Sequence, residues 1–221
     1  MTHWNNMTLL ETFEHNRYVA NLRRAYNSIG ESEVELRFGY FYKGFCPGLV
    51  LKTGGENKLI EYDSASYSMI LARLRSMGVE EVYTHTIDNK YNVGGMNYKE
   101  SIDQKTKKVT YQQKERVEDI DFWDWDLRVS VSKETDIKKN PIPEGSVPSI
   151  SREKKRHSFL VKGVQYDLTV VYFDENTDNC AKKNRNKKKR AKRYEFECEF
   201  VKKPSSFEKW LKKIRKCVGI Y

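Results

Sequence analysis

The sequence predicts a mainly β (α+β) protein whose antiparallel strands form a barrel or a sandwich. Eight short segments are rich in β-branched and aromatic residues, and several of them alternate polar and apolar residues. Only three segments repeat apolar residues at helical spacing. A chain with many short strands and few helices is typical of an antiparallel barrel or sandwich.

Three helices are expected, each with one apolar face. The first covers residues 8–29 and ends before Gly30, and the second covers residues 63–78 with Asp63 or Ser64 as its N-cap. The third covers residues 205–219 and places five apolar residues on one stripe: Phe207, Trp210, Leu211, Ile214 and Val218. The length suits a single domain of residues 1–221, with an N-terminal helical segment (1–30), the strands (31–203) and a C-terminal helix (204–221).

The strands are expected between the first and the last helix. The eight candidates are residues 34–42, 82–91, 96–102, 109–117, 124–133, 155–161, 166–173 and 194–202. The segment "KKNPIPEGSVPS" is rich in proline and predicts a loop. Residues 174–193 predict a long hairpin connection, in which residues 182–193 form a basic run.

The composition favours an anionic partner. The chain of 221 residues has a formal net charge of +10, which suits nucleic acid, free phosphates or an anionic surface. Its four cysteines form no CxxC pair, so neither a zinc site nor a disulfide framework is indicated. No apolar run has the length of a membrane span or of a signal peptide. We therefore expect a reduced, intracellular protein without a membrane segment.

Carboxylates alternate with apolar residues in two segments far apart in the chain. In "EVELRFG", Glu33, Glu35 and Arg37 share one face of a strand, and "YEFECEF" places three more glutamates on one face: Glu195, Glu197 and Glu199. The polar faces of the other strands carry mostly basic, hydroxyl and amide groups: Gln112, Lys114 and Arg116; Arg128, Ser130, Ser132 and Glu134; Lys154, Arg156 and Ser158; Gln165, Asp167 and Thr169. For any single strand a solvated polar face explains this alternation, but it does not explain why the charges segregate by strand.

Segregated charges suggest that the sheet closes with its ionic faces inward and its apolar faces outward, under the helices. Clustered carboxylates repel one another, and a hard divalent cation with oxygen ligands would relieve that repulsion. Arginine and lysine on the opposite wall suit phosphate oxygens. Together these groups predict a pocket for a triphosphate.

In these features the sequence resembles the triphosphate tunnel metalloenzymes, specifically the RNA 5′-triphosphatases of mRNA capping in fungi, protozoa and large DNA viruses. It is most similar to the triphosphatase domain of a large DNA virus capping enzyme. The resemblance covers about residues 30–202 and rests on the order of the two glutamate strands and the basic strands between them. It implies a closed eight-stranded antiparallel β-barrel tunnel with helices packed on the outside.

The resemblance also implies the roles of individual residues. Glu33, Glu35 and Glu199 would bind the metal ion, with Glu195 and Glu197 beside them. The catalytic residues would be Glu134, Arg128, Lys154, Arg156 and Glu197, of which Glu134 would orient the attacking water. The phosphate-binding residues would be Arg37, Lys99, Arg116, Arg128, Lys154 and Arg156, with Lys114 as an alternative to Arg116. Asp167 and Thr169 match an Asp-x-Thr pair, but Gln165 stands where the family often has arginine, which leaves the partner of Asp167 open.

The implied activity is hydrolysis of the γ-phosphate of triphosphate-ended RNA, the first step of mRNA capping, with an NTPase side activity. The implied cofactor is Mg²⁺ or Mn²⁺. The implied partners are the 5′-triphosphate end of nascent RNA, nucleoside triphosphates and a fused or associated guanylyltransferase, in the cytoplasm, a viral factory or the virion. Two alternatives stay open: another triphosphate-tunnel activity, such as an inorganic tripolyphosphatase, and a non-catalytic RNA-binding β-domain. The second does not explain five glutamates on two strand faces.

Overall fold

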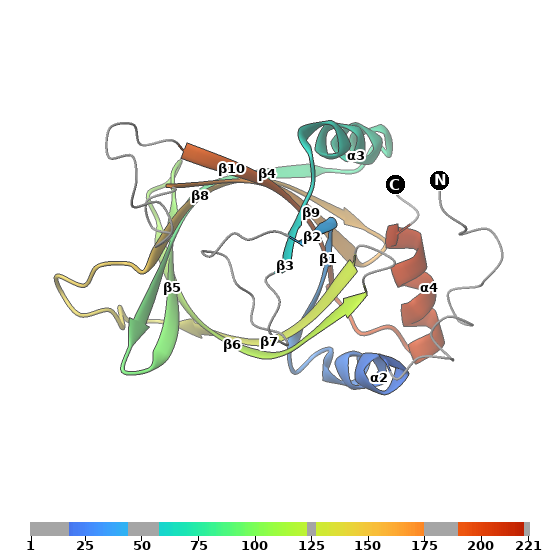
Figure 1. Ribbon diagram of the computed structural model, residues 1–221, viewed down its shortest axis with the longest axis horizontal. Coiled ribbons are helices and arrows are strands. Elements are labelled where there is room, and N and C mark those ends of the chain that lie inside the picture. Colours follow the sequence, from blue (N-terminus) through green and yellow to red (C-terminus); the bar gives the residue numbers. More distant parts are fainter. Residues whose placement is uncertain (1–17, 44–57, 123–126, 175–189, 219–221) are drawn as a thin grey trace.

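Eight antiparallel strands form a closed barrel in the computed structural model, which describes residues 18–43, 58–122, 127–174 and 190–218. Around the ring lie β1 (Glu33–Phe38), β10 (Arg190–Phe200), β9 (Val164–Asp174), β8 (Ile150–Val161), β4 (Glu81–Val93), β5 (Met96–Asp103), β6 (Val109–Phe122) and β7 (Leu127–Ile137). The last of these pairs with β1 and closes the ring (Figure 1). The predicted closed eight-stranded antiparallel barrel is therefore confirmed.

Among the described residues, three helices are present, and they lie outside the ring (Figure 1). They are α2 (Tyr18–Ser28), α3 (Ser64–Ser76) and α4 (Phe207–Val218). Asp63 caps α3, because its carboxylate accepts a hydrogen bond of 2.7 Å from the Ser66 amide. The predicted first helix agrees over 18–28, and its predicted residues 8–17 lie outside the described residues. None of the described helices is long and apolar enough to cross a membrane.

The hydrophobic core lies between the outer face of the barrel and the helices. Leu36 and Phe38 of β1 and Phe196 of β10 are buried on that face, and they meet Trp210 and Ile214 of α4 in one cluster. Trp210 is 0% exposed and lies against Tyr26 of α2, with ring centroids 5.8 Å apart. Because the apolar side chains of these strands point outward, their polar side chains point into the barrel. The inward orientation of the ionic faces is confirmed.

One predicted strand is divided in two. Residues 34–42 were expected to form a single strand, but β1 ends at Phe38 and β2 (Tyr40–Lys43) pairs with β3 (Lys58–Glu61) in a separate two-stranded sheet. Gly39, between them, has a φ of 152°, which side chains with a Cβ rarely adopt. This backbone conformation ends β1, and β3 was not predicted at all.

Several strands extend beyond their predicted ends. β8 begins at Ile150 instead of residue 155, and β10 begins at Arg190, so that residues 190–193 belong to a strand and not to the expected loop. The rest of the basic run, 182–189, lies outside the described residues. A run of polar residues usually indicates the end of a strand, because such residues face bulk water in a loop. In this barrel the polar residues of a strand line the cavity, so a polar run does not show where β8 or β10 begins.

Candidate active site

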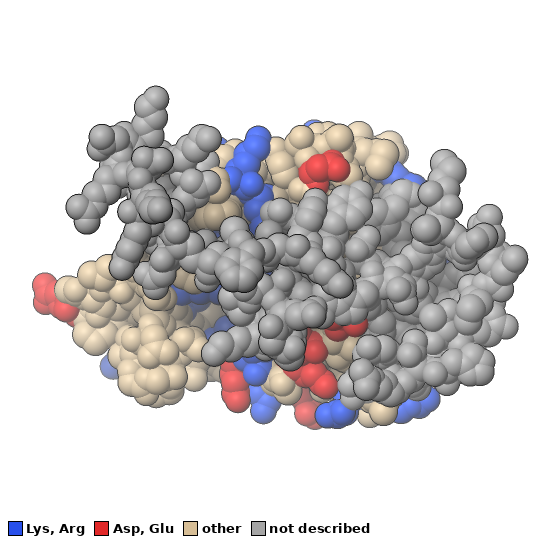
Figure 2. Space-filling model, viewed as in Figure 1, with Lys and Arg blue, Asp and Glu red and all other residues tan. Residues whose placement is uncertain are grey.

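The inside of the barrel holds a cavity of about 700 Å³, lined by side chains from all eight strands and mostly by charged ones. In the space-filling view, Lys and Arg side chains (blue) and Asp and Glu side chains (red) both appear on the visible face (Figure 2). Of the predicted catalytic, phosphate-binding and metal-binding residues, all but Arg128 line this cavity. Gln165 and Thr169 do not line it, but they contact Asp167 and Arg156, which do. The sorting of strand faces from the sequence therefore identified the cavity wall.

The two glutamate strands are direct neighbours in the barrel. Glu35 of β1 pairs in register with Glu199 of β10, and Arg37 pairs with Glu197. Burial raises the pKa of Glu199 to about 7, together with repulsion from Glu33, Asp167, Glu35 and Glu134. Within the described part of the chain, no ion pair or hydrogen bond joins the Glu199 side chain to a partner. This end of the cavity carries an excess of negative charge.

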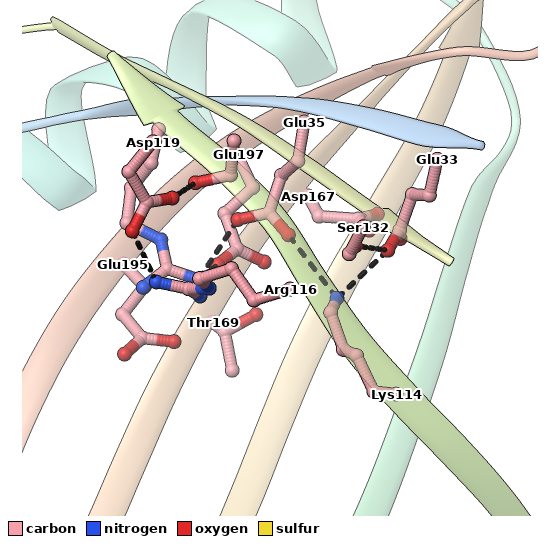
Figure 3. A network of polar contacts seen from close by, with 12 residues as sticks. Glu33, Glu35, Lys114, Arg116, Asp119, Ser132, Asp167, Thr169, Glu195 and Glu197 are labelled. Carbon is pink, nitrogen blue, oxygen red and sulfur yellow. Dashed lines mark hydrogen bonds and ion pairs between the residues drawn. The ribbon is translucent and has the colours of Figure 1, made fainter. Parts of the chain in front are cut away.

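Lys114 of β6 lies among three carboxylates, two of which, Glu33 and Glu35, are seen beside it in Figure 3. Its ammonium is 2.7 Å from Glu33 Oε2, 2.7 Å from Glu134 Oε1 and 3.9 Å from Glu35 Oε2. Burial alone would lower the pKa of Lys114, but the three carboxylates outweigh it and raise that pKa. Of the two residues considered for one basic position, Lys114 is thus the one that meets the carboxylates. Arg116 binds Asp119 at 2.6 Å instead.

Glu134 stays ionised in this arrangement. Its burial raises the pKa, but the hydrogen bond and charge of Lys114 outweigh that effect and lower the pKa below its usual value. Its side chain lies on the same cavity wall as Glu33 and Ser132, which donates a 3.0 Å hydrogen bond to Glu33 Oε2. An ionised carboxylate in this position can accept a hydrogen bond from water.

Arg156 of β8 contacts side chains of the two strands that follow it in the chain, β9 and β10. Its guanidinium donates to Thr169 Oγ1 at 3.1 Å, to Asp167 Oδ2 at 3.1 Å and to Glu197 Oε2 at 3.4 Å. Gln165, in place of the family arginine, donates its side-chain amide to Asp167 at 3.1 Å. Arg156 therefore balances the charge of Asp167. It is the basic partner that the sequence left open, where Gln165 stands in place of the family arginine.

Lys154 and Lys99 lie on the opposite wall. The Lys154 ammonium is 2.9 Å from Asp88 Oδ2, and Asp88 also accepts a 2.9 Å hydrogen bond from Ser101. Burial opposes ionisation of Asp88, but Lys154 lowers its pKa to about 2. Lys99 lines the same cavity, and the loss of surrounding water together with repulsion from Lys154 lowers its pKa.

Arg128 does not line the cavity. It is 1% exposed and donates two hydrogen bonds to Asp121, at 2.5 and 2.8 Å. In register it lies beside Arg37. A phosphate could reach this guanidinium only if its contacts with Asp121 were rearranged. The role that the resemblance implied for Arg128 stays a prediction.

Sequence reasoning missed five charged residues in or near the cavity: Asp88, Lys90, Asp119, Arg152 and Arg193. Asp88 and Lys90 are two apart in one strand, so the alternation could have revealed them. Asp119 was hidden, because a shift of register between Arg116 and Glu118 changes which residues of β6 face inward. Arg193 had been assigned to the basic loop.

The donor set fits a hard divalent cation in its chemistry. Glu33, Glu35 and Glu199 offer carboxylate oxygens from adjacent strands, and the charge around Glu199 is not balanced. Within residues 18–43, 58–122, 127–174 and 190–218, no three acidic, histidine or cysteine side chains converge closely enough to hold a metal as they stand. Glu33 and Glu35 are instead held by Lys114 and Arg37.

Comparison with solved structures supports the same fold. The S. pombe Pct1 RNA triphosphatase in complex with the Spt5 CTD matches with a TM-score of 0.63 at 16% identity, over 98% of this chain and 88% of that chain. The RNA triphosphatase domain of a trifunctional mimivirus mRNA capping enzyme matches with a TM-score of 0.62 at 13% identity, over 97% and 98%. No curated protein sequence matches the chain.

A family model, described as mRNA capping enzyme, beta chain, matches residues 57–215. The match contains β4 to β10 and therefore Glu134, Lys154, Arg156 and Glu199, but it excludes β1. The structure adds Glu33 and Glu35 to the same cavity by pairing β1 with β10. Since the match covers more than half of the chain, the chain belongs to the mRNA capping enzyme beta-chain family of mRNA triphosphatases and is an RNA 5′-triphosphatase.

Proposed function

We propose that the chain removes the γ-phosphate of triphosphate-ended RNA in a reaction that depends on a divalent cation, Mg²⁺ or Mn²⁺, held by Glu33, Glu35 and Glu199. The observation that carries the proposal is the register pairing of Glu35 with Glu199, which brings two carboxylate strands together in a cavity whose other walls are basic. When bound, a divalent cation would polarise the γ-phosphate oxygens as a Lewis acid.

The residues of the chain have distinct tasks in this proposal. Lys154 and Arg156 bind the phosphate oxygens and stabilise the negative charge that spreads over them during transfer. Arg37 and Lys99 add positive charge on neighbouring walls, and Lys114 holds Glu33 and Glu134 in place. Glu134 accepts a hydrogen bond from the attacking water and orients it. Glu195 and Glu197 fix the arginines, since Glu195 binds Arg193 and Glu197 binds Arg37 and Arg156.

Free nucleoside triphosphates carry the same phosphates, so we propose them as side substrates. The diphosphate end that the reaction leaves on RNA suits a guanylyltransferase, and we propose that one acts with this chain, fused to it or associated with it, in the cytoplasm or a viral factory. The mimivirus capping enzyme, whose triphosphatase domain has a similar fold, is trifunctional, and this supports the idea of a fused partner.

The test is phosphate release from γ-labelled triphosphate-ended RNA, with and without divalent cation, beside free nucleotide and inorganic tripolyphosphate. We expect release from RNA only when the cation is present. Faster release from tripolyphosphate than from RNA would favour the alternative of a tripolyphosphatase. Release that is unaffected by chelation would overturn the metal dependence.

A further inference from the structure

Two cations in the cavity, Lys90 of β4 and Arg152 of β8, have no use in the proposed reaction, and we call them the distal cations. Both line the cavity. Neither side chain forms an ion pair or a hydrogen bond with any residue of the described ranges. This distinguishes them from Lys154, Arg156 and Arg193, each of which binds a carboxylate.

The distal cations repel each other and their basic neighbours. The loss of surrounding water lowers the pKa of Lys90 to about 7, together with repulsion from Arg152 first and then from Lys154, Arg116 and Arg37. Burial lowers the pKa of Arg152 as well, and repulsion from Arg193 and Arg37 adds to this effect, while Glu195 and Asp88 offset part of it. Basic side chains of three strands, β8, β6 and β1, thus repel the Lys90 ammonium. An anion bound beside it would relieve this repulsion.

The backbone holds the distal cations on a rigid wall. The Lys90 carbonyl oxygen accepts hydrogen bonds from the Ser149 amide at 2.8 Å and from the Ser149 hydroxyl at 3.0 Å. These bonds tie β4 to the residue that precedes β8. Asp88, two residues before Lys90, pairs in register with Arg152. A fixed backbone sets where both side chains begin, so only the side chains have to become ordered when an anion binds.

The backbone of the distal cations lies farther from the carboxylate end than a triphosphate bound there would extend. On β8, Arg156 contacts Asp167 and Glu197, and Arg152 is four residues away on the same face. Four residues span about 13 Å along a strand, of which about 9 Å remains along the axis of a barrel with tilted strands. Three phosphorus atoms linked through bridging oxygens span less than this. The next anion in line is the first phosphodiester of an RNA chain.

We propose that Lys90 and Arg152 form a second anion subsite, which binds the first phosphodiester behind the 5′-triphosphate and makes the tunnel prefer RNA to free nucleotide. The inference rests on the proposed function, because that function places the γ-phosphate at the Glu199 end. The proposal also gives the direction in which the substrate lies. The RNA chain leaves the tunnel at the end where Lys90 and Arg152 lie.

Binding is measured with two ligands that resist hydrolysis, both in the presence of Mg²⁺. One is a short RNA carrying a 5′ β,γ-imidotriphosphate, and the other is the β,γ-imido analogue of its first nucleotide. The variant Lys90→Met/Arg152→Met removes both charges and keeps side-chain length. The control Lys133→Met/Lys155→Met removes the same charge from β7 and β8, at residues that do not line the cavity.

We expect the double variant to bind the RNA analogue at least tenfold more weakly than the unchanged protein, since each charge-assisted hydrogen bond to phosphate is a strong one. The slope of log affinity against log salt should fall by roughly 0.7, because the contact with one phosphate is lost. Affinity for the nucleotide analogue should stay within about twofold, and the control should bind both ligands normally. Thermal unfolding of the double variant should not shift downward, because neither side chain has a partner to lose among the described residues.

Equal weakening for both ligands would overturn the proposal, because the distal cations would then bind the triphosphate itself. Unchanged binding of RNA would overturn it too, since Lys90 and Arg152 would then contact only water and not the RNA. Failure of the proposed function looks different: the unchanged protein would release no phosphate from triphosphate-ended RNA, whatever its binding preference.

Discussion

Glu35 of β1 and Glu199 of β10 are direct partners in the antiparallel ladder between these strands, although 163 positions separate them in the chain. Antiparallel partners on one face lie within about 5.5 Å of each other at Cβ, so two like charges here cost stability unless a cation balances them. The pKa of Glu199, raised to about 7 by burial and by four carboxylates, is the electrostatic sign of that cost.

The first prediction concerns the carboxylates. Glu35→Gln should reduce phosphate release from triphosphate-ended RNA by a factor of about 10² or more, because the amide keeps the size but cannot bind a hard cation as well. Steady-state kinetics over a range of Mn²⁺ concentrations is the measurement. A variant with normal turnover at low Mn²⁺ would remove Glu35 from the site.

The second prediction concerns Arg156. Arg156→Ala should lower kcat by about 10²-fold or more, as expected for a group that stabilises the charge of the transition state. Arg156→Lys should recover only part of this, since lysine cannot replace a guanidinium that contacts Asp167 and Glu197 at once. Full recovery with lysine would show that only a point charge is needed.

The third prediction concerns Arg128, which binds Asp121 outside the cavity lining. Arg128→Met should cost stability, by leaving Asp121 buried without its partner, and should affect kcat less than Arg156→Ala does. Urea denaturation and kinetics on the same samples separate the two effects. If kcat fell as far as in Arg156→Ala while the fold stayed intact, Arg128 would have to contact phosphate directly.

The fourth prediction concerns acid stability. Glu81 accepts two hydrogen bonds from Arg75, which lower its pKa to about 2, against the opposing effect of burial and with the help of His157. A carboxylate with a lowered folded-state pKa contributes stability above its ordinary pKa of 4.5, and loses that contribution as pH falls toward 2.

Glu81→Gln should therefore destabilise the fold by about 1 kcal/mol at neutral pH, the value typical of a solvent-exposed pair. The difference from the unchanged protein should shrink as pH falls through this window. Urea denaturation at several pH values is the measurement, and a difference that stayed constant would show that the charge of Glu81 is not the cause.

The fifth prediction separates the core from the site. Trp210→Ala should destabilise the fold by about 3–5 kcal/mol, because the fully buried indole fills the space between α4, α2 and the barrel. Trp210→Phe should cost much less, since the indole nitrogen has no hydrogen-bond partner in the described structure. The folded fraction of either variant should keep normal kcat, because Trp210 lies on the outer face of the barrel. A loss of kcat with an intact fold would contradict this separation.

Alternation along the strands was enough to predict most of the inner wall, whereas the closed eight-stranded barrel was implied by the family resemblance. Glu33, Glu35, Lys154 and Arg156 could be sorted onto one face because side chains two apart in a strand always share a face. The pairing of β1 with β10 could not be predicted from the residues alone, since nothing local in either strand specifies its partner.

Local irregularities account for what was missed. The register shift after Arg116 changes the inward face of β6, so Asp119 was not found; Arg116 binds Asp119, and its role toward phosphate stays a prediction. The backbone at Gly39 ends β1 earlier than its composition suggests. The burial of Arg128 by Asp121 depends on two strands at once, and no pattern within one strand reveals it.

Direct measurement of cation binding tests the central claim most sharply. Mn²⁺ is titrated into the unchanged protein, into Glu199→Gln, and into the control Glu115→Gln, whose side chain is exposed on β6 and does not line the cavity. Bound Mn²⁺ is followed by its electron paramagnetic resonance signal. The account predicts saturable binding to the unchanged protein and the control, and binding at least tenfold weaker to Glu199→Gln. Equal Mn²⁺ affinity in all three proteins would contradict the assignment of Glu199 to the metal site.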